Sequence, residues 1–104
     1  MLIYNTTYHV EDDVRANFLI WTRQYLIPTI AGEGTLGNPK LLEVLSHREE
    51  GSSCYTLQWE VADSASLHKW HLKQGTTINE QLTKTFKDKV VGFPTLLEVL
   101  DTEQ

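Results

Sequence analysis

Apolar and polar side chains alternate strictly from Tyr55 to Val61 in the segment SCYTLQWEV. Successive side chains of a β-strand point to opposite faces of the sheet, so this pattern predicts a strand that is buried on one face only. The apolar set is Tyr55, Leu57, Trp59 and Val61, and the opposite set is Cys54, Thr56, Gln58 and Glu60. We expect the apolar set to pack against a layer of helices.

The remaining elements follow from periodicity and from glycine and proline positions. After the acidic run 11–13, a stripe of apolar residues predicts a helix from Val14 that Pro28 should kink or end. A second helix should begin near Ser64, be interrupted at 75–77 and resume with Ile78 and Leu82 on one face. Strands are predicted over 2–10, 40–48, 53–61 and 93–100.

The element order is strand, helix, strand, strand, helix, strand. Two βαβ halves joined by a hairpin predict an α+β, ferredoxin-like fold, with a four-stranded antiparallel sheet and both helices on one face. The length of 104 residues predicts one domain, 1–104. In such a monomer the other face of the sheet stays uncovered.

The side chains of that second face suggest what covers it. A four-residue turn at 49–52 would pair Arg48 with Ser53, placing Leu42 and Val44 in the core and His47 beside Cys54. In the last strand, alternation assigns Phe93, Leu97 and Val99 to the core and Glu98 to the second face. The second face then mixes apolar with polar residues: Ile3, Leu41, Leu45, Leu96 and Leu100 with Asn5, His9, His47, Gln58 and Glu98.

A face that is partly apolar and partly polar is typical of an interface or a ligand cavity. We therefore predict a homodimer in which two such sheets face each other, forming a dimeric α+β barrel. The polar residues of the dimer face would be His9, His47, Gln58 and Glu98. As an alternative, Glu43 and Glu98 could orient His9 and His47 for proton transfer.

Three segments carry a family resemblance that extends over essentially the whole chain: MLIYNTTYHVEDD, CYTLQWEV and FKDKVVGFPTLLEVL. The sequence resembles the bacterial domain-of-unknown-function family 4286, within the dimeric α+β barrel superfamily. This resemblance implies the fold and a homodimer. The family brings no established activity with it.

The same superfamily includes monooxygenases of antibiotic biosynthesis and haem-degrading enzymes. The latter use an Asn on the first strand and a Trp and a His on the second helix, and Asn5 and Trp70 resemble the first two. Glu80 stands where the haem-binding His would be, so the resemblance does not extend to haem degradation. For a cofactor-free monooxygenase or isomerase, the candidate catalytic residues are Asn5, Trp70 and His71.

The segment SLHKWHLKQG, residues 66–75, places two histidines on the second helix. At 100° per residue, Trp70 and His71 fall on the inner face and His68 at its edge. A zinc site needs three or four ligands, and the facing strand offers none beyond a phenol oxygen. We expect a hydrogen-bonded His71 in the seam between helix and sheet, with no metal and no cofactor. Candidate ligand-binding residues are Trp21, Tyr25, Trp59 and His68.

Composition narrows the choice of function. A net charge of -5 argues against a nucleic-acid binder, which needs a positive surface. The single cysteine, Cys54, excludes an internal disulfide and is expected to be a small buried residue, not a nucleophile. The apolar runs are too short to span a membrane and a signal peptide is not apparent, so we predict a cytoplasmic protein. The predicted function is binding of a small apolar or aromatic ligand; the alternative is a cofactor-free monooxygenase or isomerase.

Overall fold

Four antiparallel strands form one sheet in the order β2-β3-β1-β4 in a computed structural model that describes residues 1–101. The strands are β1 (Leu2–Glu11), β2 (Gly37–Glu43), β3 (Ser52–Val61) and β4 (Val90–Glu98). β1 pairs with both β3 and β4, so the first strand lies in the interior of the sheet. The predicted ferredoxin-like α+β fold is confirmed.

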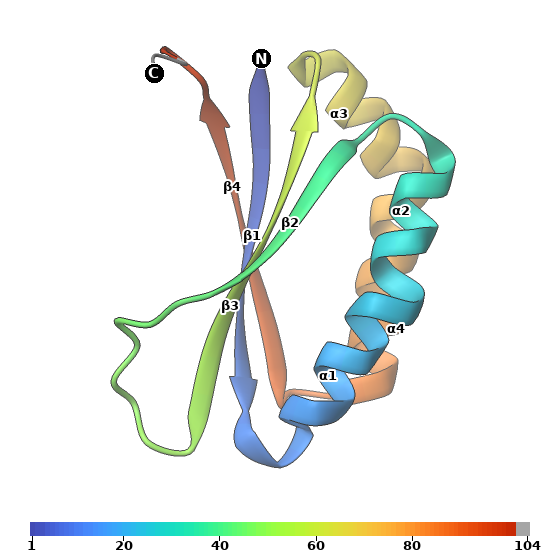
Figure 1. Cartoon of the computed structure of the whole chain (residues 1–104). Helices are drawn as coiled ribbons and strands as arrows, with labels where there is room; N and C mark the ends of the chain where they lie inside the picture. The colour runs from blue at the N-terminus through green and yellow to red at the C-terminus, as the bar shows by residue number, and fades with distance from the viewer. Residues whose placement is uncertain (102–104) are drawn as a thin grey trace.

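Two helical arms cover one face of this sheet, and in residues 1–101 the opposite face, here called the open face, carries no helix (Figure 1). The first arm comprises η1 (Asp12–Val14), α1 (Arg15–Trp21), η2 (Thr22–Leu26) and α2 (Ile27–Glu33). The second comprises α3 (Ser64–Trp70), η3 (His71–Gly75) and α4 (Thr76–Phe86). Within residues 1–101 there is no helix long and apolar enough to cross a membrane.

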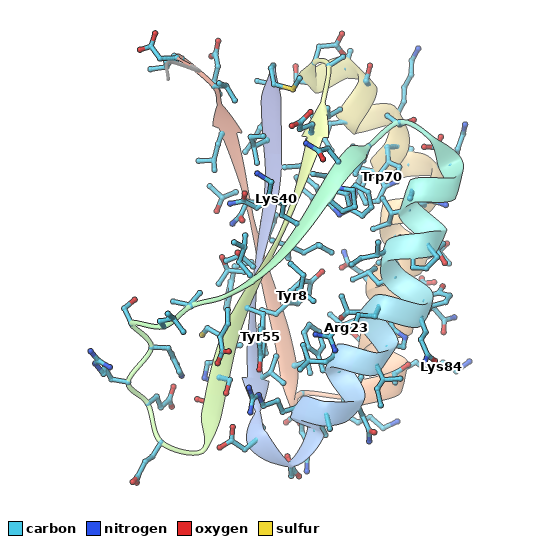
Figure 2. The ribbon with its side chains drawn as sticks, viewed as in Figure 1. Tyr8, Arg23, Lys40, Tyr55, Trp70 and Lys84 are labelled. Atoms are coloured by element: carbon cyan, nitrogen blue, oxygen red, sulfur yellow. The ribbon has the colours of Figure 1, made fainter. Side chains whose placement is uncertain are left out.

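The core lies between the sheet and the helical arms, as the alternation in β1 and β3 predicts. Tyr8 and Tyr55 face the helices, and Trp70 reaches toward the sheet from the second arm (Figure 2). Phe18 is fully buried at the centre, where its ring lies 5.2 Å from that of Tyr8 and 6.0 Å from that of Phe86. Aromatic packing of this kind joins both helical arms to the sheet.

The predicted strand 40–48 is wrong in its second half. β2 ends at Glu43, and residues 44–51 form a loop. Leu41, not Val44, pairs with Leu57, a three-residue difference in register. An odd shift moves every side chain to the other face, so Leu41 packs against the core while Leu42 is 43% exposed.

The predicted faces of the last strand are also reversed. β4 pairs Gly92 with Tyr8 and Glu98 with Leu2, which places Phe93 and Leu97 on the open face. A Cβ atom at residue 92 would lie 3.0 Å from the Tyr8 ring, so a glycine is needed opposite that ring. Glu98 therefore lies on the helix-facing side of the sheet and not on the predicted dimer face.

Neither helical arm is broken where the sequence suggests a break. Gly75 and Thr76 keep helical dihedral angles, and η3 is a π-helical turn that joins α3 to α4. In the first arm, the π-helical turn η2 ends two residues before Pro28, and the helix continues to a left-handed cap at Gly34. Pro28 stands in the first turn of α2, where a proline is tolerated.

Candidate functional site

A cavity of about 140 Å³ lies between the sheet and the two helical arms. Its sheet side is formed by Tyr4, Tyr8 and Trp59, and its helix side includes Trp70 and Ile78. Both π turns contribute to the wall, through residues at the end of η2 and at both ends of η3. π turns are frequent at functional sites, since they redirect side chains that a regular helix would hold elsewhere.

Trp70 is held in place by contacts with Tyr4 and Gln74. Its ring meets the ring of Tyr4 edge to face at 5.8 Å, and its Nε1 donates to Gln74 Oε1 at 2.8 Å. Gln74 Nε2 in turn donates to the backbone carbonyl of Thr29 at 3.2 Å, which ties the second arm to the first. The indole is 3% exposed, so its plane forms a fixed wall of the cavity.

His71 lies at the mouth of the cavity and not inside the seam. Its side chain lines the cavity but is exposed, and it also borders a shallow surface depression with Asn79. The ring packs on the Cα atom of Gly75, where a Cβ atom would come within 2.5 Å of His71 Nδ1. The expectation of a buried His71 is wrong because the π turn directs Gly75, one turn later, toward the core.

The phenol of Tyr8 is a buried polar group in the cavity wall. Burial raises its pKa above the ordinary value, so Tyr8 is neutral at physiological pH. Thr6 and Asn79 add uncharged polar groups, and no carboxylate, lysine or arginine of residues 1–101 lines this cavity. The site thus offers aromatic walls and neutral hydrogen-bonding groups, a combination suited to an uncharged aromatic molecule.

The size of the cavity limits what it can hold. An apolar cavity of roughly 150 Å³ accommodates a molecule of benzene size. At about 140 Å³ the cavity fits a single ring and is far too small for a porphyrin or a fused polycycle.

The predicted catalytic residues do not come together. Asn5 pairs with Gln58 and Thr95 on the open face, whereas Trp70 and His71 line the cavity on the opposite side of the sheet. Of the predicted ligand-binding residues, only Trp59 lines the cavity. His68 is exposed on α3.

Trp21 and Tyr25 lie in a separate groove between the first arm and α4. Their rings are 5.4 Å apart, and Trp21 meets Phe86 at 5.7 Å. The groove is a more open depression than the cavity, and it shares no lining residue with it.

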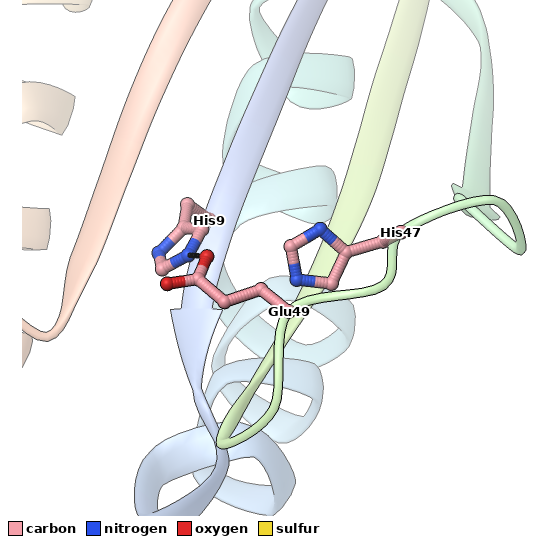
Figure 3. A group of neighbouring side chains, drawn as sticks. All are labelled: His9, His47 and Glu49. Atoms are coloured by element: carbon pink, nitrogen blue, oxygen red, sulfur yellow. Dashed lines mark hydrogen bonds and ion pairs between the residues drawn. The ribbon is translucent and has the colours of Figure 1, made fainter.

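On the open face, a second group of polar side chains surrounds His9. His9 Nε2 lies 2.9 Å from Glu49 Oε1, and the His9 and His47 rings are 5.7 Å apart (Figure 3). His47 contacts Ser52 Oγ at 2.9 Å through Nε2 and Cys54 Sγ at 3.3 Å through Nδ1. The hydrogen bond from His9 and the charge of that ring hold the pKa of the Glu49 carboxyl below its usual range.

The carboxylate of this group is not one that the sequence analysis named. Glu98 is paired with Leu2, seven residues along β1 from His9, roughly 23 Å away at 3.3 Å per residue. Glu43 lies toward the helices, 3.7 Å from Arg15. The missed residue, Glu49, belongs to the loop 44–51. The predicted strand ran to residue 48, so the sequence pattern did not indicate that this loop lies near His9.

The family model described as "Domain of unknown function (DUF4286)" matches residues 1–100 of the chain. The chain belongs to the DUF4286 family. A comparison with curated proteins gives no match for this DUF4286 protein.

Solved structures share the fold of this DUF4286 protein. One, from Deinococcus radiodurans, is provisionally assigned as an antibiotic biosynthesis monooxygenase; it superimposes with a TM-score of 0.68 at 17% identity, covering 100% of this chain and 97% of its own. Another is a dimeric ferredoxin-like protein from an uncultured marine organism, with a TM-score of 0.55, 16% identity, and coverage of 96% and 95%. At these identities the likeness establishes the fold alone.

Proposed function

We propose that this protein is a homodimer that binds a small, uncharged aromatic molecule in the cavity between the sheet and the helical arms. The observation that carries the proposal is the cavity itself, with its aromatic walls at Tyr4, Trp59 and Trp70 and its neutral phenol at Tyr8. A ligand that fills the cavity would gain roughly 25 cal/mol of binding free energy for each Å² of its apolar surface that is removed from water. A single-ring phenol matches both the volume and the polarity.

The two tryptophans in the wall provide the test. We expect phenol and its single-ring analogues to change the tryptophan fluorescence in a saturable manner, while bicyclic and larger aromatic molecules bind more weakly. Ile78→Trp, which fills part of the cavity, should remove saturable binding. Trp21→Phe changes only the separate groove and should leave binding intact. Equal binding by wild type and Ile78→Trp would contradict the proposal.

A second candidate function is a cofactor-free monooxygenase or isomerase acting in the same cavity. It is favoured by the fold shared with the Deinococcus radiodurans protein and by the placement of His71 at the mouth of an aromatic cavity. A solvent-accessible imidazole there could accept a proton from a bound phenol. Oxygen consumption with a bound phenol, lost in His71→Ala while binding persists, would establish this activity; binding without turnover leaves the first proposal.

The open face is the proposed dimer interface. Its support is the row of exposed apolar side chains on β4, with Phe93 58% and Leu97 42% exposed, together with the dimeric state of the marine ferredoxin-like protein.

We further propose that residues 1–104 act as one domain. The free thiol of Cys54 suits a reducing compartment such as the cytoplasm.

A further inference from the structure

The group around His9 on the open face has the donor atoms of a metal site. His9, His47 and Glu49 each offer one ligand atom, and these atoms all lie within 4.8 Å of one another. Two imidazoles and one carboxylate are the protein ligands of one class of catalytic zinc site. The same set serves non-haem iron.

The three side chains come from two segments that the fold brings together. His9 stands on β1, between Cys54 of β3 and Val91 of β4 on the same face. The loop 44–51 passes over this part of the sheet and presents His47 and Glu49 toward His9 (Figure 3). A pair of exposed charges stabilises a fold by at most about 1 kcal/mol. Fold stability from the His9–Glu49 pair therefore does not explain why a second histidine, His47, lies beside it.

The contacts of His47 suit a ligand whose orientation is fixed by a neighbour. Nδ1 is in contact with Cys54 Sγ, so Nε2 is the nitrogen that would bind a metal. Binding the metal would replace the hydrogen bond between Nε2 and Ser52. Metal-binding histidines commonly use the second ring nitrogen for such an orienting contact. Cys54 would then hold the ring without binding the ion.

The present spacing requires only a small closure. Tetrahedral ligands at zinc bond lengths of about 2.1 Å lie roughly 3.4 Å apart, against a largest separation of 4.8 Å here. The side chain of Glu49 is 64% exposed and belongs to a loop, so its rotation meets little resistance. Three protein ligands leave one coordination position for water.

We propose that His9, His47 and Glu49 form a binding site for one divalent transition-metal ion of zinc type on the open face. This site is separate from the aromatic cavity, which lies on the other side of the sheet. The metal proposal therefore stands or falls independently of the proposed ligand.

The test uses the full chain, purified without a histidine tag and stripped with a chelator. Zn²⁺ is titrated in competition with a chromophoric chelator. We expect one Zn²⁺ per chain, and a loss of affinity of more than about 100-fold in each of His9→Gln, His47→Gln and Glu49→Gln. That loss exceeds the 10–100-fold change expected when only an orienting partner is removed.

Matched controls come from the same chain. Glu50→Gln alters the neighbouring carboxylate of the same loop, and His68→Gln alters an exposed histidine on α3. Both should bind Zn²⁺ like the wild type. Equal affinity in Glu49→Gln and Glu50→Gln would overturn the proposal, because Glu49 is exposed and its substitution leaves the fold intact.

Co²⁺ provides a second readout. Bound to this site it should give the visible absorption of a four-coordinate ion without a thiolate charge-transfer band, and Cys54→Ser should retain that spectrum. A thiolate band that disappears in Cys54→Ser would overturn the assignment of these three ligands. The absence of any visible absorption above that of aqueous Co²⁺ would also count against the site.

Discussion

At the scale of single residues, the close contact between Gly92 and Tyr8 determines how β4 lies on the sheet. The two residues are paired across β1 and β4, and the Tyr8 ring occupies the space that a side chain at 92 would need. With Gly92 facing the helices, Phe93 must face away from them. One missing Cβ atom thus decides which side of the last strand faces the helices.

The substitution Gly92→Ala tests this contact. Its Cβ would lie 3.0 Å from Tyr8 Cε1 and 3.3 Å from Thr6 Cγ2, so we expect a loss of about 1–3 kcal/mol in the free energy of unfolding, measured with urea. Gly32→Ala is the control, since nothing lies within 4 Å of its Cβ and the residue is in a helix. That variant should gain about 0.5–1 kcal/mol. Similar losses in both variants would refute the steric explanation.

The phenol of Tyr8 predicts a dependence of stability on alkaline pH. Its pKa is raised by burial in the folded protein, whereas in the unfolded chain it ionises near pH 10. The stabilising contribution is therefore complete below pH 10 and is lost as pH rises toward the folded pKa. In Tyr8→Phe, which keeps the ring packed against Phe18, urea unfolding should depend less steeply on pH between about 10 and 11. An unchanged slope would contradict the assignment.

At the scale of elements, the two π turns set the composition of the cavity wall. A regular helix would carry the stripe of Phe18 through Trp21 and Tyr25 to the core. The π turn η2 instead buries Thr22 and Leu26 and leaves both aromatic residues in the neighbouring groove. In the second arm, η3 buries Gly75 and moves His71 outward. At each π turn the buried residues thus differ from those that a period of 3.6 residues predicts.

The pairing of His71 with Gly75 can be measured as a coupling energy. Gly75→Ala should be destabilising in the wild type, because the new Cβ meets the His71 ring at 2.5 Å. In His71→Ala that clash is absent, so the same change should be less destabilising. A double-mutant cycle by urea unfolding should therefore give a coupling of about 1 kcal/mol or more. Additive effects would indicate that the ring does not rest on Gly75.

At the scale of the whole molecule, the open face predicts the assembly. Phe93→Asp places a charge where two sheets would meet, and the residue is 58% exposed in the monomer, so the fold should persist. Sedimentation should show a dimer for the wild type and a monomer for Phe93→Asp, since a charge left unpaired in an interface costs several kcal/mol. Leu72→Asp, at an even more exposed apolar residue on the helical side, should remain dimeric. A dimeric Phe93→Asp would exclude this face as the interface.

Local patterns in the sequence were sufficient for the element order, for the faces of β1 and β3 and for the position of Trp70 in the core. These features depend on residues close together in the chain. The faces of β2 and β4 depend on register, and an error of one or three residues reverses them completely.

The residues that line the aromatic cavity, and those that gather around His9, also could not be predicted from local patterns. The π turns decided which residues of each arm line the cavity, and no periodicity at 3.6 residues reveals an inserted residue. Glu49 reaches His9 only because the loop 44–51 folds over the sheet. Local alternation determined the fold, whereas register, helix irregularity and loop position decided which side chains meet.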